Sequence, residues 1–132
     1  MKIILDTNVL LSNYLFQGYT ADVFEHIWLN HEIFLSDWIL NEFKEKCQNK
    51  FKISTILINE ILKHLKQGSK IVNPTGTIPI ECQDPDDNNV LHLAKFINAN
   101  FIITGDKDLL NMKPFNTTEI ISPRDYKIRY LI

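Results

Sequence analysis

The chain has 132 residues, of which 45% are hydrophobic and 23% charged, and its formal net charge is −2. This length predicts one domain over residues 1–132, and the composition excludes disordered, collagen-like and low-complexity proteins. No apolar stretch approaches the roughly 18 residues of a membrane span. Asp6 and Asn8 interrupt the place where the apolar part of a signal peptide would lie, so we expect a cytosolic protein without membrane contact.

The charges are distributed unevenly along the chain. Residues 43–70 contain seven lysines and two glutamates, a net charge of +5. Residues 81–108 contain six acidic residues and two lysines, a net charge of −4. One basic and one acidic region suit a protein that binds a polyanion with the first and metal ions with the second. Two solvated faces would give the same pattern, so charge alone leaves both readings open.

Cysteine and tryptophan are predicted to serve the packing of the protein. Cys47 and Cys82 have no CxxC spacing and no histidine at zinc-finger distance, which excludes a zinc finger and a disulfide framework. We expect Cys47 in the core, together with Trp28 and Trp38.

The first 30 residues predict a strand followed by two helices. A short apolar run over residues 2–5 is typical of a buried strand, and it ends at Asp6. Two helices are predicted over residues 9–16 and 21–29, with a break between them at Gln17-Gly18.

The middle of the chain continues the alternation. A strand is predicted over residues 32–35, and Ser36 then caps a helix with apolar residues at every fourth position. Glu42 lies next to this apolar stripe without belonging to it. A helix over residues 54–67 and a brief strand over residues 71–72 follow.

The last third adds two strands. A loop rich in turn residues covers residues 73–85, and a helix begins near Asp87. The later predicted elements are a strand over residues 101–103, a short helix around residues 109–110, a strand at residues 120–121 and a last helical turn after Ser122-Pro123. This order is typical of an α/β domain with a parallel sheet and helices on both faces. Ligands of such sheets bind outside the carboxyl ends of the strands, where the sequence places Asp6 and Asp106.

Acidic side chains stand at element boundaries or beside the apolar stripe in four places. They are Asp6, Glu42, the group Asp84-Pro85-Asp86-Asp87, and Asp106 with Asp108. Most of them could be helix caps or turn residues. Asp6 has no capping role as obvious, because it follows what should be a buried central strand.

Together these carboxylates predict a metal site. Two carboxylates about 4 Å apart repel by about 4 kcal/mol at an effective dielectric constant near 20. A divalent cation removes that repulsion and also binds phosphate. Oxygen ligands without histidine or cysteine favour Mg²⁺ or Mn²⁺ over zinc.

Three motifs resemble the signatures of the PIN-domain family of metal-dependent ribonucleases. They are ILDTNVL at residues 4–10, DPDDN at residues 84–88 and TGDKDLL at residues 104–110. Glu42 and Ser122-Pro123-Arg124 also stand in family order, so the resemblance covers essentially the whole chain. It is closest to the VapC-like toxins of bacterial toxin–antitoxin systems. The resemblance implies a single three-layer α/β/α nuclease domain with a central, mainly parallel sheet.

The resemblance also implies an activity and its residues. It implies Mg²⁺- or Mn²⁺-dependent hydrolysis of phosphodiester bonds in single-stranded RNA, with an antitoxin protein as partner and homodimerisation. The catalytic and metal-binding quartet falls on Asp6, Glu42, Asp87 and Asp106. Further polar positions of the motifs fall on Asn8, Thr104 and Asp108, and Asp84 and Asp108 are further candidate metal ligands. Many relatives have Asp where this chain has Asn88, so the choice of third ligand among Asp84, Asp86 and Asp87 stays open.

Basic residues near the acidic positions are the candidate RNA-binding residues. They are Lys44, Lys46, Lys50, Lys52, Lys107 and Arg124. The first four begin two residues after Glu42 and could steer the RNA backbone toward the metal, although helix solubility explains them equally well.

Two other classes of function are weighed against a ribonuclease. An Asp-dependent phosphohydrolase or phospho-acceptor domain also has an Asp after its first strand. Phosphatases of the haloacid-dehalogenase type require a second Asp two residues later, where this chain has Asn8. A non-catalytic PIN-like module that binds RNA or protein would not need all four acids.

Overall fold

The computed structural model describes residues 1–16, 18–82 and 84–132. Five strands form a sheet in the order β3-β2-β1-β4-β5, and every neighbouring pair is parallel. The strands are β1 (Lys2–Leu5), β2 (Glu32–Leu35), β3 (Ser69–Ile71), β4 (Phe101–Ile103) and β5 (Glu119–Ile121). All five lie at or within two residues of their predicted positions, and the predicted parallel sheet is confirmed.

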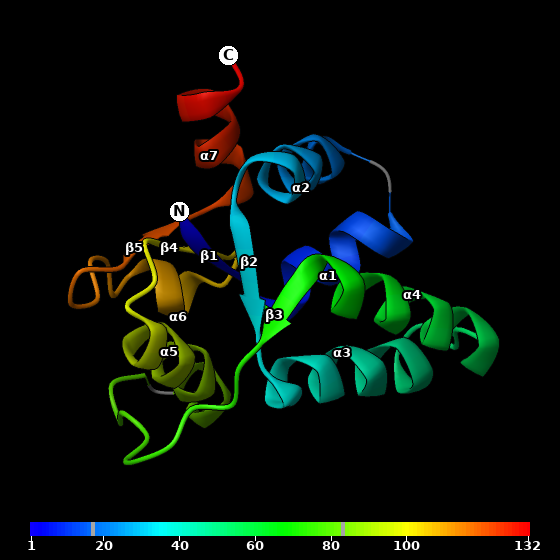
Figure 1. Ribbon diagram of the computed structural model, residues 1–132, viewed down its shortest axis with the longest axis horizontal. Helices are drawn as coiled ribbons and strands as arrows, with labels where there is room; N and C mark the ends of the chain where they lie inside the picture. Colours follow the sequence, from blue (N-terminus) through cyan, green and yellow to red (C-terminus); the bar gives the residue numbers. More distant parts are fainter. Residues whose placement is uncertain (17, 83) are drawn as a thin grey trace.

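Helices cover both faces of the sheet. They are α1 (Thr7–Leu15), α2 (Tyr19–Asn30), α3 (Asp37–Asn49), α4 (Thr55–Gly68), α5 (Pro85–Ile97), α6 (Lys107–Leu110) and α7 (Pro123–Tyr130). Figure 1 shows α1 to α4 on one side of the sheet and α5 and α6 on the other. Right-handed crossovers require this division, because the chain moves outward from β1 to β3 and then returns past β1 to β4 and β5.

The strand order reverses beside β1, which pairs with β2 on one side and β4 on the other. Open α/β sheets bind ligands at such a reversal, outside the carboxyl ends of the strands. Backbone pairing continues one residue beyond the strands there: Asp6 N donates to Ile103 O (3.0 Å), and Thr104 N donates to Ile121 O (3.1 Å). Asp6 and Thr104 therefore end neighbouring strands at this edge.

The core lies on both faces of the central strands. Residues 3–5 and 102–103 are fully buried, which explains why β1 and β4 are continuous apolar runs. On α3, Cys47 is buried as predicted and packs in the core. Trp28 and Trp38 are only half-buried and pack against the edge of the core, contrary to prediction. Tryptophan is large enough that it is rarely enclosed completely.

Capping residues explain where helix bounds differ from prediction. Helix α5 begins at Pro85, two residues before Asp87, because the Asp84 side chain caps it by accepting from Asp86 N (3.0 Å). Pro85 suits the first helical position because it has no N–H to satisfy. The last element is a helix of eight residues, longer than the predicted turn.

The predicted break between α1 and α2 falls partly outside the described residues, which do not include Gln17; Gly18 is the N-cap of α2. Within the described ranges of the chain, no helix combines the length and apolar character needed to cross a membrane.

Candidate functional site

Asp6 is buried at the end of β1, where it caps α1. One carboxylate oxygen accepts from Thr7 N (2.8 Å), and the other accepts from the Thr104 hydroxyl (2.7 Å). The sequence made a capping role less obvious for Asp6 than for the other acids, and the structure shows that it has one. Burial raises the pKa of the Asp6 carboxyl, whereas the two hydrogen bonds lower it. The nearby charges of Glu42 and Asp106 raise this pKa further.

Thr104 connects Asp6 to Asp106. Its fully buried hydroxyl donates to Asp6 and accepts from Asp106 N (3.0 Å). Asp106 in turn caps α6, where its Oδ1 accepts from Asp108 N (2.9 Å). The Asp6 carboxylate and the Asp106 backbone are therefore tied to one hydroxyl group.

Asp87, Asp106 and Asp108 form a carboxylate cluster, with one oxygen of each within 4.8 Å of the others. Asp87 is buried, Asp106 half-buried and Asp108 exposed. Burial raises the pKa of the Asp87 carboxyl, and so does the close approach of Asp106. Asp6 and Glu42 lie outside this 4.8 Å set, although the charge of Asp6 also raises the pKa of Asp87.

One oxygen of the cluster lacks a partner. Asp87 Oδ2 is buried and has no hydrogen-bond partner within the described part of the chain. Burying a carboxylate oxygen without a donor costs several kcal/mol unless a cation or proton compensates it. The oxygen-only cluster around Asp87 therefore has the chemistry that a hard divalent cation requires.

Glu42 reaches the same edge from α3. It is half-buried and lines a pocket of about 340 Å³ together with Trp38, Asn41, Glu45 and Asp86. This acidic pocket lies between α3 and the first turn of α5. Asp86 is exposed here, whereas its neighbour Asp87 points into the cluster.

Asn88 and Cys82 have positions that the sequence pattern did not indicate. Asn88 Oδ1 accepts from Glu81 N (3.1 Å) and Cys82 N (2.8 Å), so its amide holds the preceding loop against α5. Burial, and then the nearby carboxylates of which Asp87 is the strongest, raise the pKa of the Cys82 thiol to about 11. The only sequence signal for the position of Cys82 is that it lies in a loop just before the acidic motif at residues 84–88.

The remaining candidate residues lie at different distances from the cluster. Asn8 is exposed in the first turn of α1, and Asp84 is exposed at the start of α5. Lys107 adjoins Asp106, and Arg124 is exposed where α7 leaves the sheet edge. The four candidate lysines follow Glu42 along α3 and past its C-terminal end: Lys46 lies one helical turn after Glu42 on the same face, whereas Lys50 lies eight residues, or about 12 Å of helix, beyond it. They are Lys44, Lys46, Lys50 and Lys52.

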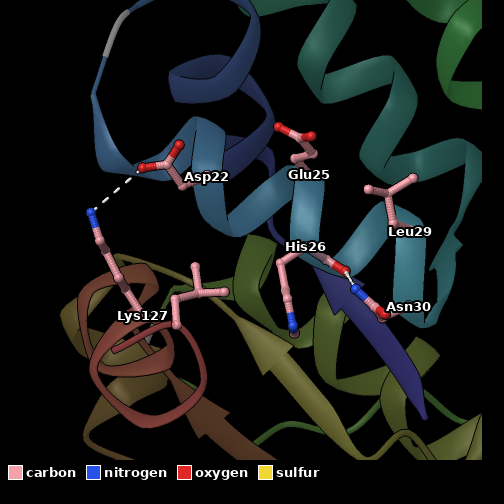
Figure 2. Close-up of a pocket in the computed structure, with 7 residues that line it drawn as sticks. Asp22, Glu25, His26, Leu29, Asn30 and Lys127 are labelled. Atoms are coloured by element: carbon pink, nitrogen blue, oxygen red, sulfur yellow. Dashed lines mark hydrogen bonds and ion pairs between the residues drawn. The ribbon is translucent and has the colours of Figure 1, made fainter.

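A separate groove of about 410 Å³ lies between α2 and α7. Figure 2 shows Asp22 directed toward Lys127 across it, with an ion-pair distance of 3.5 Å. His26, on the same wall, is bonded through Nδ1 to the Tyr126 hydroxyl (2.8 Å). None of the residues that line this groove belongs to the acidic motifs, so we do not place the functional site there.

Comparison with known proteins identifies the family of this chain. The family model for the PIN domain matches residues 2–108. The chain belongs to the PIN-domain family. PIN domains are typically nucleases, and this PIN domain carries the acidic cluster described above.

Two relatives illustrate the similarity. The PIN domain is 34% identical over 126 residues to the uncharacterized protein MJ1680 of Methanocaldococcus jannaschii, covering 88% of this chain and 77% of the relative. It also superimposes on a chain of the crystal structure of VapBC2 from Rickettsia felis bound to a DNA fragment from their promoter. The TM-score is 0.61 at 15% identity, over 92% of this chain and 98% of the other. This second likeness shows a shared fold.

Proposed function

We propose that this PIN domain is an endoribonuclease that hydrolyses phosphodiester bonds of single-stranded RNA with Mg²⁺ or Mn²⁺. The observation that carries the proposal is the buried, unpartnered Oδ2 of Asp87 beside the carboxylates of Asp106 and Asp108. A nuclease explains this energetically costly arrangement, because a cation bound there would also bind a phosphate group.

The four acids of the quartet have distinct tasks in this proposal. Asp87 and Asp106 would hold the cation directly, with Asp108 as a further ligand from the exposed side. Asp6 would complete the site in one orientation, which Thr104 and the N-terminus of α1 fix. Glu42 would approach from α3, and Asp84 serves mainly as the cap of α5.

The chemistry supplied by a bound divalent cation is neutralisation of the phosphodiester charge and a lowered pKa for water. In hydrolysis, the water oxygen bonds to phosphorus and the bond from phosphorus to the 3′-oxygen breaks. The products carry 5′-phosphate and 3′-hydroxyl ends. The proton that the water loses passes to solvent, and the departing 3′-oxygen takes up a proton from solvent to become the 3′-hydroxyl.

We further propose that the protein is the toxin of a toxin–antitoxin system in the cytosol. The shared fold with a chain of VapBC2 supports this assignment, as do the three motifs. The partner would be a small antitoxin protein that covers the acidic edge of the sheet, and the active form would be a homodimer.

RNA cleavage tests the proposal. A mixed single-stranded RNA is incubated with wild type, Asp106→Asn or Asp22→Asn, in Mn²⁺, Mg²⁺ or EDTA. Asp22 is a matched control because its carboxylate is exposed and pairs with Lys127 in the separate groove. We expect cleavage by wild type and Asp22→Asn, none in EDTA, and a loss greater than about 100-fold for Asp106→Asn.

Two outcomes would contradict a nuclease. Equal cleavage by all three proteins would identify a contaminating ribonuclease. Absence of cleavage by wild type, together with metal-dependent stabilisation and RNA binding, would identify a non-catalytic module.

A further inference from the structure

Two more pockets adjoin the acidic pocket along α5. The second pocket, of about 290 Å³, shares Trp38 with the acidic pocket, and its other lining residues include Asn73, Pro74, Ile78, Asn89 and His92. The third pocket, of about 320 Å³, shares His92 with the second and is lined by Thr75, Thr77, Lys95 and Phe96. Each pocket shares one lining residue with the next, so the three lie in a row along α5 that begins beside Glu42, and we call this row the track.

Trp38 forms the wall between the first two pockets. It precedes Glu42 by four residues on α3, so both side chains lie on one face of the helix, about 6 Å apart along its axis. The ring is half-buried and packs against the edge of the core. This packing holds an aromatic surface one helical turn from a proposed metal ligand.

The second pocket has neutral, polar walls. None of its lining residues is acidic or basic, apart from His92, and two of them carry amides. Asn73 is fixed by Asp37: its Oδ1 accepts from Asp37 N (2.9 Å) and its Nδ2 donates to Asp37 Oδ2 (2.8 Å). His92 is bonded to Thr75 O (3.1 Å), which ties the loop over the pocket to α5. The walls are therefore held in place before any ligand arrives.

These walls match a nucleobase better than a phosphate. Proteins bind unpaired bases by stacking them on aromatic rings and by hydrogen bonds from amides to the base edge. A phosphate would require a cation, which the second pocket lacks and the third supplies in Lys95. The volume of about 290 Å³ is close to the smallest ligand pockets, about 300 Å³, and suits a group as small as a single base.

We propose that the second pocket binds a nucleobase of the RNA, stacked on Trp38, next to the phosphodiester that is cleaved. The inference rests on the proposed function and makes it more specific. The strand then runs from the acidic pocket past Trp38 toward Lys95, which contacts a phosphate further along. The substrate must be single-stranded over this track, because a paired base cannot stack on Trp38.

Cleavage kinetics with two tryptophan variants test this base pocket. Stacking on an aromatic residue is worth about 1–3 kcal/mol per base, so we expect Trp38→Ala to raise KM about 10-fold while kcat stays within about twofold. Trp38→Phe retains a ring and should restore most of the loss. Tyr19→Ala is the matched control, because Tyr19 is an exposed aromatic residue on α2. Thermal unfolding of each variant establishes that it is folded.

An RNA without a base at one position identifies the ligand of Trp38. Abasic nucleotides are placed in turn on either side of the cleaved bond. At one position we expect the missing base to raise the KM of wild type by the same factor as Trp38→Ala raises the KM for normal RNA. Combining both changes should then add nothing. The base pocket would be overturned if the increases in KM from the abasic nucleotide and from Trp38→Ala multiplied at every position. A Trp38→Ala variant with the KM of wild type would also overturn it.

Binding measurements separate this inference from the proposed function. If wild type cleaves no RNA, the same oligonucleotides are titrated by fluorescence anisotropy in Ca²⁺. Affinity that falls about 10-fold in Trp38→Ala and recovers in Trp38→Phe supports the base pocket in a non-catalytic protein. Equal affinity for all variants, or no RNA binding, overturns the base pocket. A partner protein would then be the better candidate to bind the track.

Discussion

At the carboxyl ends of β1 and β4, a single hydroxyl group links the carboxylate of Asp6 to the backbone of Asp106. The Thr104 hydroxyl donates to the Asp6 carboxylate and accepts from the backbone N–H of Asp106. Asp6 and Thr104 are buried, and Asp106 is half-buried. This hydrogen bond orients the Asp6 carboxylate, whose negative charge lies near that of Asp106. Residues here serve the fold and the site at once, since Asp6 and Asp106 are both helix caps.

Asp106→Asn separates the charge of this residue from its capping role. Asparagine caps helices as well as aspartate, so the bond from Asp108 N is retained and one charge of the cluster is removed. We expect the metal-free protein to gain about 1 kcal/mol in free energy of unfolding, because repulsion falls in a half-exposed cluster. Urea unfolding in EDTA measures this. A marked destabilisation would indicate that the carboxylate has a structural role instead.

At the scale of single elements, the first turn of α5 decides which acid enters the cluster. Asp84 is the cap and Pro85 the first helical residue, so Asp86 and Asp87 are consecutive positions about 100° apart around the helix. Asp86 consequently faces the acidic pocket with Glu42, and Asp87 faces Asp106. A helix that began at Asp87 would instead have made Asp86 the N-cap and directed the two side chains differently.

The end of α4 depends on a close contact with α2. A Cβ on Gly68 would lie 1.9 Å from two ring atoms of Trp28. That ring cannot move easily, because it is stacked between Phe24 (centroids 5.4 Å apart) and His64 (4.5 Å).

We therefore expect Gly68→Ala to destabilise the protein by about 1–3 kcal/mol, although alanine favours helices over glycine by about 1 kcal/mol. Chemical denaturation with urea measures the change. Ser69→Ala is a neighbouring control that should lose only the hydrogen bond of its hydroxyl to Leu65 O. A Gly68→Ala variant as stable as wild type would mean that Trp28 has room to shift.

For the whole molecule, the acidic edge makes stability depend on pH when no metal is bound. The pKa of Asp87 is raised above its ordinary value of 3.8, first by burial and then by Asp106. The native state thus binds more protons than the unfolded chain between about pH 4 and the raised pKa of about 8. Stability from this group is complete in acid and is lost as the pH rises through the raised pKa.

The difference in free energy of unfolding between wild type and Asp87→Asn isolates this effect. In EDTA, the free energy of unfolding of wild type should fall relative to that of Asp87→Asn between pH 5 and pH 8. Saturating Mn²⁺ should remove the fall, because a bound cation keeps the carboxylate ionised. Parallel pH profiles for the two proteins in EDTA would contradict a raised pKa at Asp87.

The order of strands and helices, the parallel sheet and the acids at its carboxyl edge were all predictable from the sequence. These features depend on local periodicity and on turn or capping residues, which a linear pattern contains. Three features depended on the tertiary structure. They are the choice of Asp87 from the DPDD group for the cluster, the hydrogen bond that Thr104 donates to Asp6, 98 positions away, and the half-buried ring of Trp38. Each of them follows from how the reversed strand order brings β1, β4, α3 and α5 to one edge, and burial there is decided by neighbours that are distant in the chain.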